Sequence, residues 1–184
     1  MITVKTLPAP PVDRREIFRY ARAGTPTPEL EALLDACLEE AAPVLSYRVC
    51  FGEFPIKIDG ARIDFGFAAA ESAALAKFLA GAHAAILLAA TVGAPLDRLI
   101  ARAQVTSPTK ALLFDAIGVE RVEALCDAFS DSPRFSPGYG DLPLEFQREI
   151  FRALDCPRKI GLSLGESLLM TPSKFVTAIL PIKE

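Results

Sequence analysis

The sequence predicts a mixed α/β fold of the α+β class, in which one domain spanning residues 1–184 interleaves helices with short strands. Three observations support this class. Of the 184 residues, 51% are apolar, so a single domain can bury a sizeable core. Residues 55–59 and 61–65 flank an Asp-Gly turn, which is typical of a β-hairpin. Residues 108–130 carry apolar side chains at helical spacing.

The N-terminal part predicts an edge strand followed by two helices. Residues 1–7 alternate apolar and polar side chains and lead into a proline-rich stretch, which favours a short edge strand with an extended continuation. Asp13 is expected to cap a short helix, with Glu16 three residues later completing a pair that resembles a capping box. Thr27 is expected to cap a second helix, which Pro43 ends.

Strands and helices alternate along the rest of the chain. Residues 83–90 form a short all-apolar run, which is typical of a strand buried on both faces. Further helices are expected over residues 71–79, 95–104, 108–130 and 141–154. Asp141 is expected to cap the last of these helices. A final β-like pair, residues 160–164 and 175–180, is expected to close the chain.

Composition excludes several functional classes. Twenty basic residues against 23 acidic ones give a net charge of −3, which argues against a nucleic-acid partner. The four cysteines form no Cys-x-x-Cys motif, so we expect small buried thiols in a reducing cytosol and no metal site. The most apolar window, residues 84–96, is much shorter than the roughly 18 residues that span a membrane. With no signal-peptide pattern at the N-terminus, these features predict a cytoplasmic protein without a membrane partner.

Other candidate motifs are weak. Residues 138–140 read Gly-Tyr-Gly and begin like a dinucleotide fingerprint, but Pro143 occupies the position of the third glycine. The single histidine, His83, is a possible general base, although a packed or edge histidine fits its place at the start of an apolar strand. Asp59 and Asp64 are expected to be solvated on the hairpin.

The segment Arg134-Phe135-Ser136-Pro137-Gly138-Tyr139 carries the most informative pattern. Pro137 fixes one φ angle, and Gly138 permits backbone geometries closed to other residues. Such a corner can expose backbone N–H and C=O groups to a ligand, while the guanidinium of Arg134 binds a carboxylate. The same spacing also fits an ordinary turn that leads into a helix.

This segment resembles the Arg-x-(Ser/Ala)-Pro-Gly-Tyr signature of the S-adenosylmethionine-binding activation domain of cobalamin-dependent methionine synthase. Residues 116–127 are similar to the family helix that carries a ligand-binding glutamate. Residues 160–177, which include Glu-Ser, Met170 and Pro172, are similar to the family's closing Leu-Thr-Glu-Ser…Met…Pro…Ser-Val-Ser segment. The matching motifs extend over about residues 108–178. The resemblance implies a twisted, largely antiparallel sheet with interleaved helices, as in stand-alone versions of this domain.

The resemblance also implies a function in methionine biosynthesis. Such a domain binds S-adenosylmethionine and supports the reductive methylation of cob(II)alamin, which a separate corrinoid-binding methionine synthase core holds. The electron comes from a donor that the sequence does not identify. The protein would be a component of a methyltransferase, without catalytic side chains of its own. The chain has no Asp-x-His-x-x-Gly motif, so it is not expected to carry the cobalamin itself.

Five residues match the family's ligand-binding positions. Arg134 matches the motif arginine, which would bind the methionyl carboxylate or a neighbouring acceptor. Ser136, Gly138 and Tyr139 match the loop positions that frame the ligand, largely through backbone groups. Glu123 matches the ligand glutamate best, and a carboxylate suits an α-ammonium group; a solvated helix face is the alternative for this residue.

The sequence departs from the family pattern at several points. Gly165 replaces the usual threonine, and Phe175 stands where a small serine is common. Asp13 is the one candidate for an N-terminal ligand aspartate, and Glu184 precedes the region that supplies a further tyrosine in the long enzyme. These departures favour an alternative, a non-catalytic docking subunit for a corrinoid or methyl-transfer protein that does not bind S-adenosylmethionine. A third hypothesis is an unrelated enzyme that uses His83.

Overall fold

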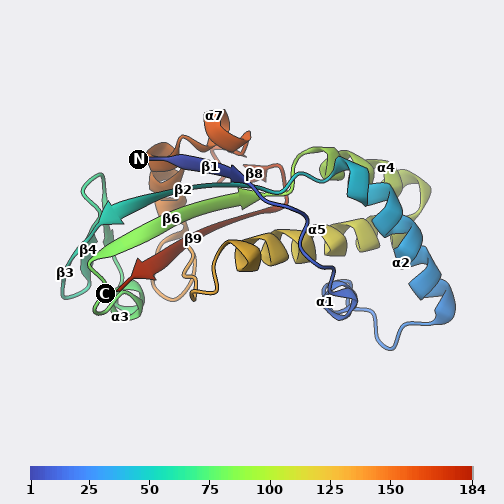
Figure 1. The fold of residues 1–184 in the computed structure, drawn as a ribbon, viewed down its shortest axis with the longest axis horizontal. Helices are drawn as coiled ribbons and strands as arrows, with labels where there is room; N and C mark the ends of the chain where they lie inside the picture. Colours follow the sequence, from blue (N-terminus) through green and yellow to red (C-terminus); the bar gives the residue numbers. More distant parts are fainter. Residues whose placement is uncertain (184) are drawn as a thin grey trace.

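The computed structural model describes residues 1–183, and its centre is a four-stranded sheet (Figure 1). The strand order is β1-β2-β6-β9, and each neighbouring pair is antiparallel. The four strands are β1 (Thr3–Thr6), β2 (Arg48–Pro55), β6 (Ala84–Thr91) and β9 (Phe175–Ile182). One row across the sheet places Lys5, Val49, Ala90 and Val176 beside one another. The predicted α+β fold with a largely antiparallel sheet is confirmed.

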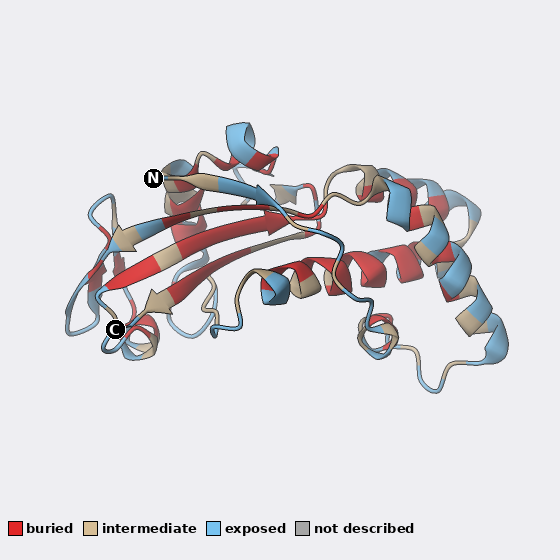
Figure 2. Cartoon of the chain, in the orientation of Figure 1, coloured by how far each residue is buried: buried red, intermediate tan, exposed pale blue. Residues whose placement is uncertain are grey.

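Strand β6 lies in the middle of this sheet and is buried along almost its whole length (Figure 2). Its residues are apolar on both sides because both faces of the sheet are covered, which confirms the interpretation of the apolar run. The strand begins at Ala84, one residue later than predicted. His83 is exposed just before it, and its backbone N–H donates to the carbonyl of Ile182. This position corresponds to an edge histidine.

One face of the sheet packs against helices that gather around α5 (Pro108–Phe129). The other helices of this group are α1 (Arg14–Tyr20), α2 (Pro28–Ala41) and α4 (Pro95–Thr106), and a short 3₁₀ helix, η1 (Ala42–Val44), follows α2. Figure 1 shows α1 and α2 beside α5, beyond the end of the sheet. The core of this face combines apolar side chains of the sheet and of α5, among them Val49, Leu88, Ala90, Ala178, Phe114, Ile117 and Val122.

The opposite face carries smaller elements and a second core. They are a three-stranded sheet, formed by β3 (Lys57–Asp59), β4 (Arg62–Asp64) and β5 (Ala69–Glu71), and the helices α3 (Ala73–Phe78), η2 (Leu144–Phe146), α6 (Gln147–Leu154) and α7 (Cys156–Ile160). Alternation along a strand sends successive side chains to opposite faces, so Cys50 and Ala89 enter this second core while Val49 and Ala90 enter the first. The expected Asp-Gly hairpin is present between β3 and β4.

The start of α1 differs from the predicted capping box. Asp13 caps the helix as expected, and its carboxylate accepts from the N–H groups of Arg15 and Glu16. Glu16 does not complete the pair, because its carboxylate binds Arg19 instead. The N–H of Asp13 donates to Glu120 on α5 at 2.9 Å. A contact distant in sequence has replaced the local one.

Asp141 does not cap the helix that follows it, so that prediction is wrong. The helical region begins only at Leu144 with η2 and continues as α6 from Gln147. The carboxylate of Asp141 binds the beginning of α3 instead, where it accepts from the Ser72 hydroxyl and from the N–H of Ala73.

The predicted pairing of residues 160–164 with 175–180 is also wrong. A short helix, α7, occupies Cys156–Ile160 and begins after Asp155, which has a left-handed φ of 52°. Strand β7 (Ser163–Leu164) then pairs with β8 (Met170–Thr171) in a small hairpin. Strand β9 pairs with β6 because its apolar residues complete the buried centre of the main sheet.

Four cysteines are buried and form no disulfide: Cys37, Cys50, Cys126 and Cys156. Over residues 1–183, no cluster of three acidic, histidine or cysteine side chains is arranged to hold a metal ion. In the same range no helix has both the length and the apolar character needed to cross a bilayer.

Candidate functional site

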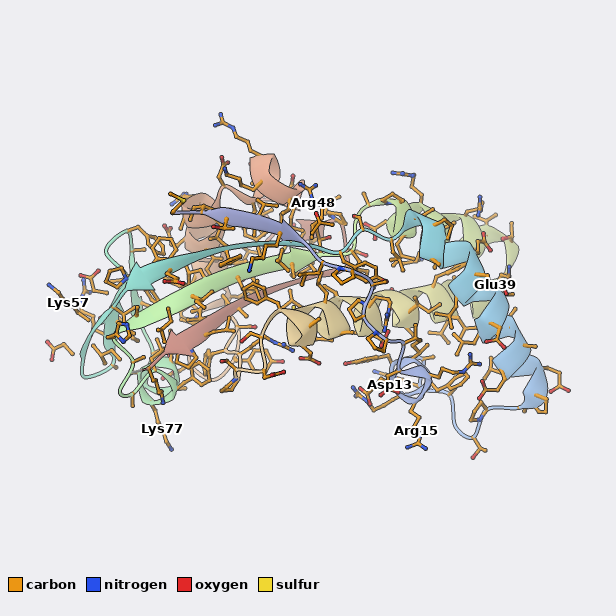
Figure 3. The ribbon with its side chains drawn as sticks, viewed as in Figure 1. Asp13, Arg15, Glu39, Arg48, Lys57 and Lys77 are labelled. Atoms are coloured by element: carbon orange, nitrogen blue, oxygen red, sulfur yellow. The ribbon has the colours of Figure 1, made fainter. Side chains whose placement is uncertain are left out.

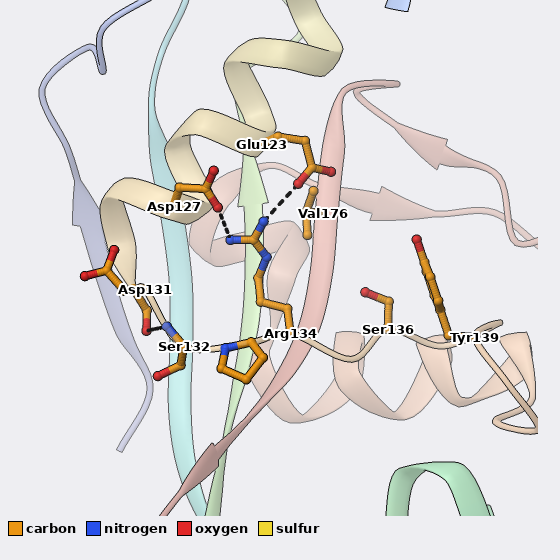
Figure 4. Close-up of a pocket in the computed structure, with 10 residues that line it drawn as sticks. Glu123, Asp127, Asp131, Ser132, Arg134, Ser136, Tyr139 and Val176 are labelled. Atoms are coloured by element: carbon orange, nitrogen blue, oxygen red, sulfur yellow. Dashed lines mark hydrogen bonds and ion pairs between the residues drawn. The ribbon is translucent and has the colours of Figure 1, made fainter. Parts of the chain in front are cut away.

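The loop after α5 closes a surface cavity of about 480 Å³ (Figure 4). Four of the five predicted ligand-binding residues line it, namely Glu123, Arg134, Ser136 and Tyr139. They come from two elements that meet there, the last turns of α5 and the segment that runs beside β9. The fold therefore brings candidates from separate parts of the sequence to one cavity.

Arg134 lies between two carboxylates of α5. Its Nη2 is 3.0 Å from Oε2 of Glu123, and its Nη1 is 2.7 Å from Oδ1 of Asp127. Burial disfavours the charged guanidinium, but the hydrogen bond to Asp127 and the charges of nearby acidic groups outweigh it and raise the pKa of Arg134 above its ordinary value. Arg134 is thus a fixed cation at neutral pH, and both its partners face the cavity.

Asp127 was not predicted as part of this site. It lies four residues after Glu123, so one face of α5 presents both carboxylates. This i,i+4 spacing was the signal in the sequence. The side chain of Asp127 is 70% exposed, compared with 42% for Glu123 and 20% for Arg134.

Pairing with the edge of the sheet sets the direction of the loop. The backbone of Phe135 exchanges two hydrogen bonds with Ile179 of β9, of 3.0 and 2.7 Å. Because side chains alternate along such a paired segment, Arg134 and Ser136 share one side while Phe135 packs toward the second core. The Ser136 hydroxyl donates to the carbonyl of Thr177 at 2.8 Å, which fixes the next residue of the loop.

The Pro-Gly corner turns tightly, and its backbone N–H groups form hydrogen bonds within the loop. Gly138 has a φ of +90°, where other residues are strained, and its N–H donates to the carbonyl of Leu142. The N–H of Tyr139 donates to the carbonyl of Ser136. These two N–H groups are not exposed to a ligand as the corner suggested. Tyr139 instead offers its side chain at the cavity, and the residue is 68% exposed.

A second cavity, of about 440 Å³, adjoins the first across α5. Glu123 and Asp127 line both cavities, and the second also includes Asp13 and Tyr20. Figure 3 shows Asp13 where the N-terminal segment meets α1. The structure thus places the candidate N-terminal aspartate on the cavity that shares Glu123, not beside Arg134.

A buried ion pair holds this N-terminal segment in place. Arg121 is 1% exposed and binds the carboxylate of its neighbour Glu120. It also donates to the carbonyls of Pro10, at 2.6 Å, and Pro11, at 2.7 Å. Since Glu120 accepts from the N–H of Asp13, the pair fixes the wall of the second cavity.

Comparison with known proteins gives a structural neighbour. No protein-family model matches the sequence, and neither does any curated protein. Among solved structures, the chain is similar to the MetH reactivation domain bound to AdoHcy. The TM-score is 0.73 and the identity 14%, and the match covers 98% of this chain and 78% of that one. The fold is that of the MetH reactivation domain. An identity this low shows the fold alone.

Proposed function

We propose that this protein binds S-adenosylmethionine beside Arg134 and supports the reductive methylation of cob(II)alamin held by a separate corrinoid-binding methionine synthase core. The observation that carries the proposal is the meeting of Glu123, Arg134, Ser136 and Tyr139 on one cavity, since two separate sequence motifs contribute these residues. The fold shared with a domain crystallised with AdoHcy, the demethylated form of this ligand, supports it independently.

The charges of the cavity suit such a ligand. The amino-acid part of S-adenosylmethionine carries a carboxylate and an ammonium group, and its sulfonium adds a further positive charge. Arg134 supplies a fixed cation for the carboxylate, and Glu123 supplies an anion for the ammonium group. Asp131, a further acidic residue of the cavity, adds negative charge that suits the sulfonium.

Binding requires an exchange of partners at Arg134. The ligand carboxylate would replace Asp127, whose largely exposed side chain can turn into water at little cost. The guanidinium keeps two charge-assisted contacts throughout, so the exchange leaves no buried charge unpaired.

The proposed methyl transfer needs no general acid or general base from this chain. In the proposed reaction an electron from a separate donor and the methyl group of the sulfonium both reach cobalt on the partner, and S-adenosylhomocysteine remains. The role of Arg134, Glu123 and Tyr139 is to hold and orient the methyl donor toward that partner. This agrees with a cavity whose titratable groups are carboxylates, one arginine and one tyrosine.

The second candidate function is a docking subunit that does not bind S-adenosylmethionine. The contacts within the cavity favour this second function. The charge of Arg134 is already balanced by Glu123 and Asp127, and the N–H groups of Gly138 and Tyr139 donate within the loop. This function predicts a stable complex with a corrinoid protein that S-adenosylmethionine does not affect.

Isothermal titration calorimetry distinguishes the two functions. S-adenosylmethionine is titrated into the full chain, alone and with the corrinoid core, and S-adenosylhomocysteine is tested as a competitor. We expect saturable binding that the competitor displaces. Absence of binding under both conditions would refute the leading proposal, and complex formation without a ligand effect would support the docking subunit.

A further inference from the structure

One side chain ties the ligand-binding loop to a helix on the opposite face of the sheet. The carboxylate of Asp141 accepts from the Ser72 hydroxyl, from the N–H of Ala73 at 2.8 Å and from the N–H of Ala74 at 3.2 Å. The bond from Ser72, and then those from the two amides, holds the pKa of Asp141 below its ordinary value. The loop residue is therefore ionised and fully engaged at neutral pH.

Helix α3 does not depend on Asp141 for all of its capping. Ser72 is 1% exposed, its Oγ accepts from the N–H of Leu75 at 3.0 Å, and its carbonyl accepts from the N–H of Ala76. These are the local N-cap contacts expected of a serine. Asp141 satisfies the two N–H groups that this local cap leaves free, and it does so from a residue 68 positions away from Ala73.

The loop is in close contact with α3 at the same place. A Cβ atom on Gly140 would lie 2.9 Å from Cβ of Ala74, and the φ of Gly140 is +55°. One residue earlier, the ring of Tyr139 contacts Phe135, with centroids 6.5 Å apart, and Phe135 packs on Phe78 of α3 at 5.4 Å. Aromatic contacts and the carboxylate of Asp141 thus fix Tyr139 from two sides.

We propose that Asp141 is a positioning residue for the cavity, because its bonds to Ser72 and the first turn of α3 hold the loop in the conformation that places Tyr139 at the cavity. Asp141 does not itself line the cavity. The effect on ligand affinity rests on the proposed function, whereas the effect on the loop does not. Losing Asp141 leaves the local cap of α3 and both apolar cores intact, so the change is confined to the loop and the first turn of α3.

The experiment compares Asp141→Ala and Asp141→Asn with a matched control, Glu145→Gln. Glu145 is exposed four residues later, so the control removes the same charge from the same region. Amide hydrogen exchange without ligand is measured for residues 136–142. We expect exchange to rise by about fivefold or more in Asp141→Ala, less in Asp141→Asn and not at all in Glu145→Gln. Urea unfolding should remain one cooperative transition, with its midpoint lowered only by the loss of these capping contacts, because both apolar cores are unchanged.

In the second part of the experiment, the same variants are titrated with S-adenosylmethionine. We expect the dissociation constant to rise about fivefold in Asp141→Ala, with a partial effect in Asp141→Asn. Unchanged loop exchange in Asp141→Ala would overturn the proposal whatever the ligand does. Faster exchange with unchanged affinity would overturn the positioning role. If the wild type does not bind the ligand, the proposed function fails, and the exchange data still decide whether Asp141 anchors the loop.

Discussion

Helix α5 carries two arginine–carboxylate sites that differ in burial. At the first, Arg121 and Glu120 are almost wholly buried, with side-chain exposures of 2% and 4%. At the second, Arg134 binds Glu123 and Asp127, whose carboxylates are 42% and 70% exposed. The two sites use the same chemistry and lie about one turn apart along the helix.

The difference in burial separates a structural site from an exchangeable one. Each nitrogen of the Arg121 guanidinium donates to a fixed group, including the carbonyls of Pro10 and Pro11, so no position is left for a ligand. Such a pair is hard to break, because the remaining charge would stay buried. Arg134 has partners that water can solvate, so an incoming carboxylate can replace one of them. An arginine between acidic groups marks a binding site only where its partners can leave.

The largest effect is expected at the buried site. Arg121→Met should lower the free energy of unfolding by about 3–5 kcal/mol, because it leaves Glu120 as an unpaired buried charge. It should also release the segment that ends at Asp13. Urea denaturation measures the first effect.

The double variant Glu120→Gln/Arg121→Met is the control for that measurement. It removes both charges, so its stability should lie above that of Arg121→Met alone. A loss below about 1 kcal/mol in Arg121→Met is the size expected for an exposed arginine and would contradict the assignment of this site as structural.

Arg134→Met should change ligand affinity strongly and stability little, in contrast to Arg121→Met. We expect S-adenosylmethionine to bind about 10- to 150-fold more weakly, because a charge-assisted hydrogen bond contributes about 1.5–3 kcal/mol. Stability should change by less than about 1 kcal/mol, since Glu123 and Asp127 become solvated. Calorimetric titration and urea unfolding measure the two quantities.

Arg102→Met is the matched control for Arg134→Met, because Arg102 also pairs with a glutamate but lies on α4. It should bind the ligand like the wild type. A large stability loss in Arg134→Met without a change in affinity would make the two arginines alike and remove the distinction between the sites.

The two carboxylates beside Arg134 should not be equivalent. Glu123→Gln should weaken ligand binding by up to about fivefold, because it removes the anion proposed for the ammonium group. Asp127→Asn should leave the affinity unchanged or increase it slightly, since it frees Arg134 of a competing partner. Titration of both variants tests the order, and a stronger loss in Asp127→Asn would reverse the assigned roles.

The smallest effect near neutral pH is expected at Cys126, which lies on α5 near Arg134. Burial raises the pKa of its thiol to about 12, from an ordinary 9.0. The thiol is neutral in both states well below pH 9, so its contribution to stability is constant there. As the pH rises from 9 toward 12, the unfolded thiol ionises first and the free energy of unfolding falls.

Urea unfolding between pH 8 and 10 tests this expectation. The decline should be shallower in Cys126→Ala than in the wild type, which corrects for other groups that titrate in this range. The native protein should also resist a thiol reagent at pH 8. Rapid reaction of Cys126 would show that water enters beneath Arg134, and the second site would then be more open than described.

Much of the fold could be predicted because its elements have local causes. The apolar run of β6, the Asp-Gly hairpin and the long apolar spacing of α5 each depend on neighbouring residues. The errors arose where a distant partner decided the structure. Asp141 binds the first turn of α3 and does not cap the helix that follows it, and β9 pairs with β6 rather than with residues 160–164. The residues near Asp141 or within β9 do not indicate which distant element they will contact.

The candidate site was predictable to a similar extent. Motif spacing selected Arg134, Ser136, Tyr139 and Glu123, which the fold brings to one cavity. It missed Asp127, although the i,i+4 spacing from Glu123 was visible in the sequence. The engagement of the backbone N–H groups at Gly138 and Tyr139 could not be foreseen, because it depends on how the corner closes on itself.

A crystal structure of the full chain with S-adenosylmethionine tests the central claim most directly. We predict the ligand in the cavity beside Arg134, with its carboxylate on the guanidinium, its ammonium group near Glu123 and Asp127 turned away. A structure at saturating ligand in which Arg134 still binds both carboxylates and the cavity holds no ligand would contradict the claim.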